Sequence, residues 1–300
     1  MIPNFEGLIA ATFTPMTAEG ALDLSRIPPL AEHLVGVGVS GLYVSGTTGE
    51  GESLTADERK ESARAYINAV RGRVPVIVQV GRNSIPEARS CAEDARSIGA
   101  DAIAVSSPSF FKPASVDALA ACVVEVAAGA PDLPVYYYHL PRMTGVEVDV
   151  AELLSRAGDR ATNLRGVKYS APDFDGLAAC LQLDGGRFDV LFGCDELLLT
   201  GLETGARAAV GSTYNFSAPI YHAVIEAFNR GDTDEAQGHQ RRAVEIVDVV
   251  LSHGGLPAMK AAMSMLGHEC GPVRLPLVAL TEAERDALRE DLDAAGFFSG

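Results

Sequence analysis

A lysine at the end of an apolar segment is the residue with the clearest chemical potential in this chain. Lys168 follows the apolar run 164–167, and polar residues begin directly after it. An ammonium ion is costly to bury, so a lysine at the mouth of a core strand is partly present as the free amine. A free amine in a cleft attacks ketones and forms Schiff bases. The alternative is a lysine that simply extends to water, as most lysines at strand ends do. The residues around Lys168 must decide between the two.

A glycine- and threonine-rich motif, Gly-Thr-Thr-Gly-Glu at residues 46–50, follows the apolar run 41–45. Its glycines allow a tight turn and a close approach to a ligand, while Thr47 and Thr48 add hydroxyls to the backbone N–H groups. This combination is typical of a site for a small carboxylate or phosphate. A tight turn with a helix cap is the alternative, because Gly/Thr turns are common. The role of Glu50, which could cap the following helix, is open at this point.

Three consecutive tyrosines end another apolar run. Alternation along a strand sends Tyr136 and Tyr138 to one side and Tyr137 to the other. Tyrosines in strands are usually structural. If Tyr138 lies near Lys168, however, its phenol is placed to move a proton during Schiff-base chemistry. His139 follows with no partner at nucleophile or metal spacing, so we assign it a structural role or a role in supporting a site residue.

Adjacent carboxylates, Asp195 and Glu196, follow the apolar run 190–192. In an acidic protein, a solvated acidic turn explains such a pair simply. The alternative is a hydrogen-bonding shelf for a polyol, with Ser212 across the mouth of the site.

Short apolar runs alternate with helix-like segments up to residue 210. The runs are apolar nearly throughout, as strands buried on both faces should be. Thr55-x-x-Glu58 fits a capping box at one helix start. Ser84-x-x-Glu87 fits a second, and Ser115 precedes a third apolar-periodic stretch. The alternation predicts an α/β fold, a (β/α)8 TIM barrel whose active face is formed by the loops after the strands. The eight runs are 8–12, 41–45, 74–80, 102–105, 135–138, 164–167, 190–192 and 206–210.

An open doubly wound sheet is the rival architecture. It usually has fewer strands and carries Gly-x-Gly-x-x-Gly after the first of them. This chain has Phe13-Thr14-Pro15-Met16 at that point, which argues against a dinucleotide-binding fold.

The C-terminal part of the chain shows only helical periodicity. The helical segments are 221–229, 234–251, 257–265 and 282–294, and Thr281-x-x-Glu284 fits a capping box for the last. We therefore expect a barrel over residues 1–219 that carries the active site, and a C-terminal helical extension over residues 220–300.

Composition limits the partners and the compartment. A formal net charge of −16 argues against binding to nucleic-acid backbones and anionic membranes. Residues 1–6 lack the features of a secretion signal, and no apolar stretch is long enough to span a bilayer. The five cysteines are scattered and do not stand at zinc spacing with histidines. We expect a cytoplasmic protein with reduced thiols and no metal site.

Together the motifs resemble those of the pyruvate-dependent class I aldolases, the family that contains N-acetylneuraminate lyase and dihydrodipicolinate synthase. The matching motifs are Gly-Thr-Thr-Gly-Glu at 46–50, Tyr-x-x-Pro at 138–141 and Gly-Val-Lys at 166–168, in the order and spacing of the family. The resemblance covers nearly the whole chain. It implies a homotetramer of barrels in which Lys168 forms a Schiff base with a 2-keto acid. It also implies that Thr47 and Thr48 bind the carboxylate, that Tyr138 shuttles protons, and that no metal or organic cofactor is needed.

Within that family the chain departs from the lysine-biosynthesis synthases. Met143 holds the place of their substrate-binding arginine, and Arg142 lies one residue early, so we expect its side chain to point elsewhere. Phe110 and Phe111 lack the hydroxyls of the tyrosine pair that feeds the synthases' proton relay.

The residues after strands five, seven and eight are instead similar to those of the sialic-acid lyases. This similarity implies reversible cleavage of N-acetylneuraminate to pyruvate and N-acetylmannosamine. It also implies that the hydroxylated tail of the sugar is bound by polar groups after strands six to eight. The alternatives are another pyruvate-dependent aldolase or dehydratase, such as dihydrodipicolinate synthase or a 2-keto-3-deoxy sugar acid enzyme, and a non-catalytic relative that binds a keto acid. The expected tail-binding residues are Ser170, Gly193, Asp195, Glu196 and Ser212.

Overall fold

Eight parallel strands close into a barrel in sequence order in the computed structural model of the protein, which describes residues 5–299. The predicted TIM barrel is therefore confirmed. Residues 1–4, part of the segment in which no secretion signal was expected, lie outside the described residues. The strands are β1 (Gly7–Ala11), β2 (Gly41–Val44), β3 (Val76–Gln79), β4 (Ala102–Ser106), β5 (Val135–His139), β6 (Leu164–Tyr169), β7 (Asp189–Phe192) and β8 (Ala208–Gly211).

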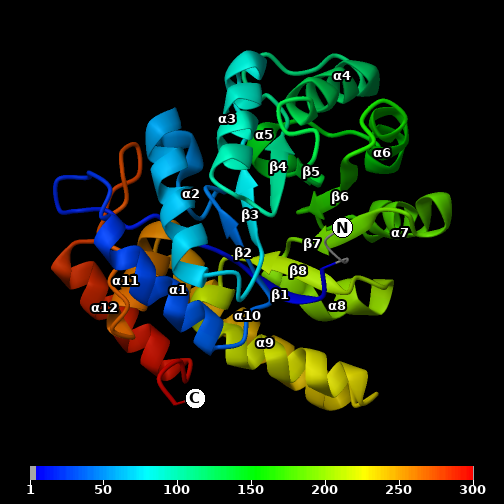
Figure 1. The fold of residues 1–300 in the computed structure, drawn as a ribbon. Coiled ribbons are helices and arrows are strands. Elements are labelled where there is room, and N and C mark those ends of the chain that lie inside the picture. The colour runs from blue at the N-terminus through cyan, green and yellow to red at the C-terminus, as the bar shows by residue number, and fades with distance from the viewer. Residues whose placement is uncertain (1–4, 300) are drawn as a thin grey trace.

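Helices surround the barrel, and a helical C-terminal part packs against one side of it (Figure 1). Short 3₁₀ turns, η1 (Leu24–Arg26), η2 (Gly51–Ser53), η3 (Leu183–Gly185) and η4 (Asp195–Leu197), join some of the elements. The helices that follow the strands are α1 (Ile27–Gly36), α2 (Ala56–Val70), α3 (Ile85–Ser97), α4 (Val116–Ala127), α5 (Pro141–Thr144), α6 (Val150–Gly158), α7 (Phe174–Gln182), α8 (Leu198–Thr204) and α9 (Tyr214–Asn229). The remaining three are α10 (Thr233–Ser252), α11 (Leu256–Met265) and α12 (Glu282–Ala294). None of the helices within residues 5–299 is both long enough and apolar enough to cross a membrane.

The helix start signals read from the sequence correspond to real caps. Thr55 forms a full capping box with Glu58 at the start of α2, and Thr281 does the same with Glu284 at the start of α12. At Ser84 only half of the expected box forms: its hydroxyl accepts from the Glu87 amide, without the reciprocal bond. Each cap satisfies amides that the first helical turn leaves without an intrahelical partner.

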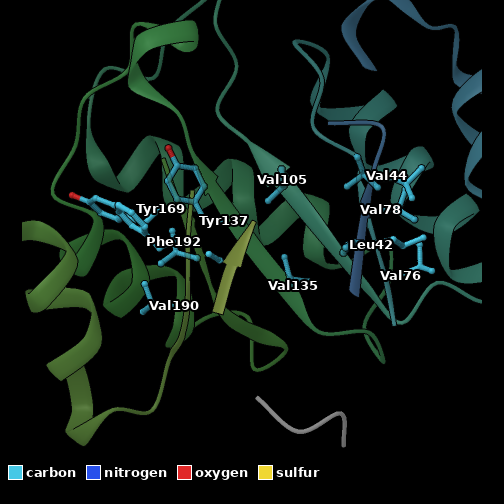
Figure 2. Close-up of a cluster of buried hydrophobic side chains, with 14 of the residues drawn as sticks. Leu42, Val44, Val76, Val78, Val105, Val135, Tyr137, Tyr169, Val190 and Phe192 are labelled. Atoms are coloured by element: carbon cyan, nitrogen blue, oxygen red, sulfur yellow. The ribbon is translucent and has the colours of Figure 1, made fainter. Parts of the chain in front are cut away.

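Side chains alternate between the two faces of each strand. Outward-facing residues form the large core between the strands and the helices, and Figure 2 shows part of it, from Leu42 and Val44 across to Val190 and Phe192. Tyr137 belongs to this outer layer, whereas Tyr136 and Tyr138 point into the barrel with Tyr43, as alternation predicts.

At the N-terminal ends of the strands, the barrel interior is filled by the polar pair Tyr136 and Asp189, which packs against Phe5. The Tyr136 hydroxyl donates to Asp189 Oδ2 over 2.9 Å, and the Phe5 amide donates to the same oxygen over 3.1 Å. Phe5 and Tyr136 pack edge to face with ring centroids 5.8 Å apart. Burial raises the pKa of Asp189, while these hydrogen bonds favour its ionised form. This pair lies at the N-terminal ends of the strands, where barrels carry stability rather than chemistry.

The expected boundary between residues 219 and 220 falls inside α9, which begins at Tyr214. Pro219 lies inside this helix, where a proline removes the hydrogen bond to the carbonyl four residues earlier. Here that carbonyl, of Asn215, accepts a hydrogen bond of 2.8 Å from His33 Nε2, and the helix kinks at Ser217. The helix thus continues past the proline, and the part added to the barrel is α10 to α12.

This C-terminal part shares a core with the barrel. Figure 1 shows α11 and α12, in orange and red, beside α1. Phe13, Leu30 and Phe216 from the barrel pack in one cluster with Val250 of α10 and Leu288 of α12. The two parts therefore form one continuous body.

Candidate active site

A cavity of about 440 Å³ opens at the carboxyl ends of the strands. All the site residues predicted from the sequence line it, although they come from five different strand–loop units. Helices α10 and α11 supply part of its wall through Val247, Leu251, Leu256 and Met259. The predicted residues in the lining are Thr47, Thr48, Tyr138, Lys168, Ser170, Gly193, Asp195, Glu196 and Ser212.

Lys168 lies within β6, which continues to Tyr169, and not just after the strand as its polar neighbours had suggested. Its side chain is only 5% exposed. The Nζ atom lies 4.2 Å from the centroid of the Tyr43 ring and 4.2 Å from that of the Tyr138 ring. The faces of aromatic rings attract cations, so this position stabilises positive charge on the nitrogen.

Tyr43 was not anticipated as a site residue. It points into the barrel from β2, and its ring packs edge to face on that of Tyr138, with centroids 5.7 Å apart. Burial raises the pKa of its phenol well above the usual value, so the hydroxyl stays protonated. A tyrosine in an otherwise aliphatic strand next to the Gly-Thr-Thr-Gly-Glu motif was the available signal in the sequence.

Tyr138 connects the lysine to the threonine loop. It pairs with Lys168 in the register of β5 and β6, which places the two side chains next to each other inside the barrel. Its hydroxyl lies 3.3 Å from Thr47 Oγ1. Tyr138 thus contacts the amine through its ring and the loop through its hydroxyl, and such a hydroxyl can give or take a proton.

The loop at residues 46–50 is a tight turn, closed by hydrogen bonds from the Glu50 amide to Thr47 O and from the Gly51 amide to Gly46 O, each of 3.0 Å. A Cβ at Gly46 would lie 2.7 Å from the ring of Tyr43, and one at Gly51 would lie 2.0 Å from Ser45 O. Both positions therefore require glycine. The Glu50 side chain does not cap the following η2 turn and is buried on the far side of the loop.

The opposite wall carries the residues expected to bind a sugar tail. Ser170 Oγ is buried without a hydrogen-bond partner, and a Cβ at Gly193 would lie 2.0 Å from it. The glycine therefore leaves room for this hydroxyl at the cavity wall. Glu196 is exposed and Ser212 is half-buried, so both remain accessible to a ligand.

Asp195 is buried and held by a residue that sequence reasoning missed. Its Oδ2 accepts hydrogen bonds from the Thr213 amide, over 2.8 Å, and from the Thr213 hydroxyl, over 2.6 Å. The same hydroxyl lies 2.9 Å from the Tyr221 hydroxyl. Burial raises the pKa of Asp195 to about 6, although the bonds from Thr213 favour its ionised form. A hydroxyl next to Ser212 in the same loop was the signal for Thr213.

Arg142 lines the same cavity as Lys168, so the expectation that its side chain points elsewhere is wrong. Met143 lines the cavity as well. Of the described residues around this cavity, Arg142 and Lys168 are the cationic ones. Arg142 adds a positive charge at the entrance, close enough to Cys194 to act on its thiol electrostatically. Burial outweighs that effect and raises the pKa of Cys194 to about 12, which keeps the thiol protonated.

The remaining candidates lie outside the cavity. His139 faces outward and stacks on Tyr169, with ring centroids 5.1 Å apart, and burial lowers its pKa to about 4. It is therefore neutral near pH 7, in keeping with a structural role. Phe110 and Phe111 are 77% and 85% exposed, with ring centroids 5.0 Å apart. Within residues 5–299, no group of three or more His, Cys, Asp or Glu side chains is arranged to hold a metal ion.

Comparison with known proteins identifies close relatives. The model of the dihydrodipicolinate synthetase family matches residues 4–295. The chain is 41% identical to N-acetylneuraminate lyase of Danio rerio over 296 residues, which are 97% of this chain and 96% of that protein. The mouse (Mus musculus) N-acetylneuraminate lyase is 40% identical, over 97% of this chain and 93% of its own length. The solved structure of Proteus mirabilis N-acetylneuraminate lyase superposes with a TM-score of 0.96 at 38% identity, covering 98% of this chain and all of that one (100%).

Proposed function

Because the chain belongs to the dihydrodipicolinate synthetase family, we propose that it is a Schiff-base aldolase that reversibly cleaves N-acetylneuraminate to pyruvate and N-acetylmannosamine. The observation that carries this proposal is the meeting of Lys168, Tyr138 and the threonine loop in one cavity. The relatives at about 40% identity that are named N-acetylneuraminate lyase support the choice of substrate.

The reaction begins at Lys168. Its amine attacks the C2 ketone of the open-chain sugar acid, and loss of water gives an iminium ion. The Tyr138 phenol supplies the proton with which the carbinolamine hydroxyl leaves as water, and it becomes a phenolate. The iminium withdraws electrons, so the C3–C4 bond breaks while the C4 hydroxyl gives its proton to this phenolate oxygen. The enamine that remains on Lys168 takes a proton at C3 from the Tyr138 phenol, which gives an iminium and a phenolate; the phenolate regains its proton from the water that adds to this iminium. Water then hydrolyses the iminium and releases pyruvate. The lysine is itself the electron sink, so the proposed reaction uses no metal or organic cofactor.

The surroundings of Lys168 suit this sequence. The faces of Tyr43 and Tyr138 stabilise the positive charge of the iminium. The ketone group of the substrate and that of the released pyruvate carry no positive charge and do not gain this stabilisation. In this proposal, Thr47 and Thr48 bind the C1 carboxylate and so place C2 over the amine.

The opposite wall would bind the hydroxylated tail. Ser170 and Ser212 offer hydroxyls, and Glu196 offers an accessible carboxylate. Asp195 lines the cavity and has one oxygen engaged by Thr213, so its other oxygen would be the one offered to the tail. Gly193 contributes space beside Ser170, and its missing side chain lets the substrate approach.

One observation favours a second candidate within the family. Arg142 at the cavity would suit a substrate whose aldehyde half carries an acidic group, as in another pyruvate-dependent aldolase or dehydratase. A substrate panel decides between these possibilities. We expect turnover of N-acetylneuraminate, and turnover of a ketodeoxy sugar acid with sialic acid inert would contradict the specificity.

Borohydride reduction in the presence of pyruvate tests the chemistry. We expect a covalent mass increase located on Lys168, because the hydride traps the iminium. A protein that binds pyruvate without any adduct would be a keto-acid-binding relative and not an aldolase.

The assembly and the compartment are part of the same proposal. The exposed aromatic pair of Phe110 and Phe111 is suited to burial between subunits, which supports a homotetramer. All five cysteines are free thiols, which supports a reducing cytoplasmic setting. Sedimentation analysis of the purified protein measures the assembly directly, and a monomer would contradict it.

A further inference from the structure

Glu50 is buried directly behind the threonine loop. The residue is 4% exposed, and its backbone has a φ of +53°, in the left-handed region. One carboxylate oxygen, Oε2, accepts a hydrogen bond of 2.7 Å from the amide of Arg274. The other, Oε1, lies 2.5 Å from Nζ of Lys260 in α11. A carboxylate so far from water requires such partners.

Lys260 is buried as completely as Glu50. Its side chain is 2% exposed, and its ammonium also donates to Thr14 O and to Pro272 O, each over 2.9 Å. These two hydrogen bonds and the ion pair with Glu50 hold the ammonium in place. Thr14 in turn donates from its hydroxyl to Gly49 O over 2.6 Å. Lys260 therefore reaches the threonine loop by two routes, through Glu50 and through Thr14.

The loop needs such support because its backbone is strained. Ser45, directly before the loop, and Glu50, its last residue, have φ of +59° and +53°, a region that side-chain-bearing residues disfavour. Strained residues of this kind persist where the surrounding structure holds them, and they are frequent at ligand-binding sites. The contacts of Glu50 with Lys260 and Arg274 are the ones that hold its side chain.

We propose that Glu50 and Lys260 are positioning residues, whose buried ion pair holds Thr47 and Thr48 in the geometry that binds the substrate carboxylate. This inference rests on the proposed function, because it assumes that a keto acid binds at these threonines. It makes the C-terminal helical part a component of the active site. A lysine that touches no substrate sets the affinity for pyruvate from behind the loop.

The test uses Lys260→Met, Glu50→Gln and the double variant in the full-length protein. For each, the pyruvate concentration that gives half-maximal borohydride adduct on Lys168 is measured together with the melting temperature. We expect each single variant to raise that concentration about tenfold to a hundredfold, as a misplaced binding group does. Each single variant should also melt earlier, because one buried polar group loses its partner.

The double variant separates positioning from stability. The double variant has neither buried charge, so no charged group is left without a partner as in each single variant. Its melting temperature should therefore recover in large part. The pyruvate concentration should remain raised, because the loop is no longer held. Tyr136→Phe is the matched control: it breaks a buried polar pair at the opposite end of the barrel, so it should lower the melting temperature without changing pyruvate trapping.

Three outcomes are decisive. Wild-type pyruvate affinity in Lys260→Met and Glu50→Gln would overturn the inference and leave the proposed function intact. Recovery of affinity together with stability in the double variant would reduce the pair to a structural role, which also overturns it. Failure of the wild-type protein to form any adduct would remove the proposed function, and this inference with it.

Discussion

Replacement of Asp195 by asparagine should stabilise the protein at neutral pH and weaken its hold on the sugar. The pKa of Asp195 is raised from 3.8 to about 6, chiefly because the carboxylate is buried. The unfolded chain therefore loses this proton at a lower pH than the folded chain does. An acid whose pKa is raised on folding favours the folded state fully below pH 3.8, and this contribution is lost as the pH rises through 6.

The size of the effect follows from the shift. A shift of about two pKa units at about 1.4 kcal/mol per unit amounts to about 3 kcal/mol. Asparagine removes the buried charge and can still accept from Thr213 through its side-chain oxygen. At pH 7.5 we expect the free energy of unfolding of Asp195→Asn to exceed that of the wild type by up to about 3 kcal/mol, and at pH 5.0 by about half of that.

Urea denaturation of both proteins at pH 5.0 and 7.5, at one low protein concentration, measures the difference. The lower pH stays above the isoelectric point of about 4.7, where the protein is least soluble. Glu196→Gln is the control: because Glu196 is exposed, the difference in stability between this variant and the wild type should change less between the two pH values than the difference for Asp195→Asn does. A stability difference that is equal at the two pH values would refute the reasoning. Asp195→Asn should also raise KM for N-acetylneuraminate while leaving pyruvate trapping unchanged.

Three other substitutions test the site more directly. Lys168→Met should abolish both turnover and the borohydride adduct, and an adduct at another lysine, found by peptide mass mapping, would contradict the assignment. Tyr138→Phe should lower kcat by about 10²- to 10⁴-fold while the adduct still forms, because only the proton carrier is lost; unchanged kcat would exclude that role. Gly193→Ala would bring a methyl group to within 2.0 Å of Ser170 Oγ, so we expect a raised KM for the sugar acid and little change for pyruvate.

The sequence was enough to predict the barrel because its strands are buried on both faces. Each strand therefore appears as an apolar run, and the alternation with capped helices is visible without any structure. Element ends were less predictable. The strand with Lys168 was expected to end before this residue, because a lysine rarely continues a buried strand, but β6 includes it since its side chain enters the lined cavity. The start of α9 was missed because only the fold reveals that His33 takes the carbonyl freed by Pro219.

Some residues of the site could be predicted from the sequence, and others could not. Residues that stand in short motifs at strand ends, such as Lys168, Tyr138 and Thr47, could be found because the fold brings strand ends together. Residues that act through contacts with residues far away in the sequence could not be found in this way. Lys260 lies in a helix with nothing unusual in its sequence, and its importance depends on a loop at the other end of the chain. Tyr43 was visible only as a strand residue until its ring was seen beside the lysine.

Because α10 and α11 supply part of the cavity wall, the residues that shape the cavity differ from the residues proposed to carry out the reaction. Lys168 and Tyr138, the residues proposed to break the carbon–carbon bond, lie on barrel strands. Val247, Leu251 and Met259 line the cavity from helices that follow the last strand in the chain. Substitutions at these three positions can enlarge or narrow the room for an aldehyde without disturbing the amine or the phenol. Selection, natural or in the laboratory, can therefore change which sugar this scaffold accepts while the reaction itself is inherited unaltered.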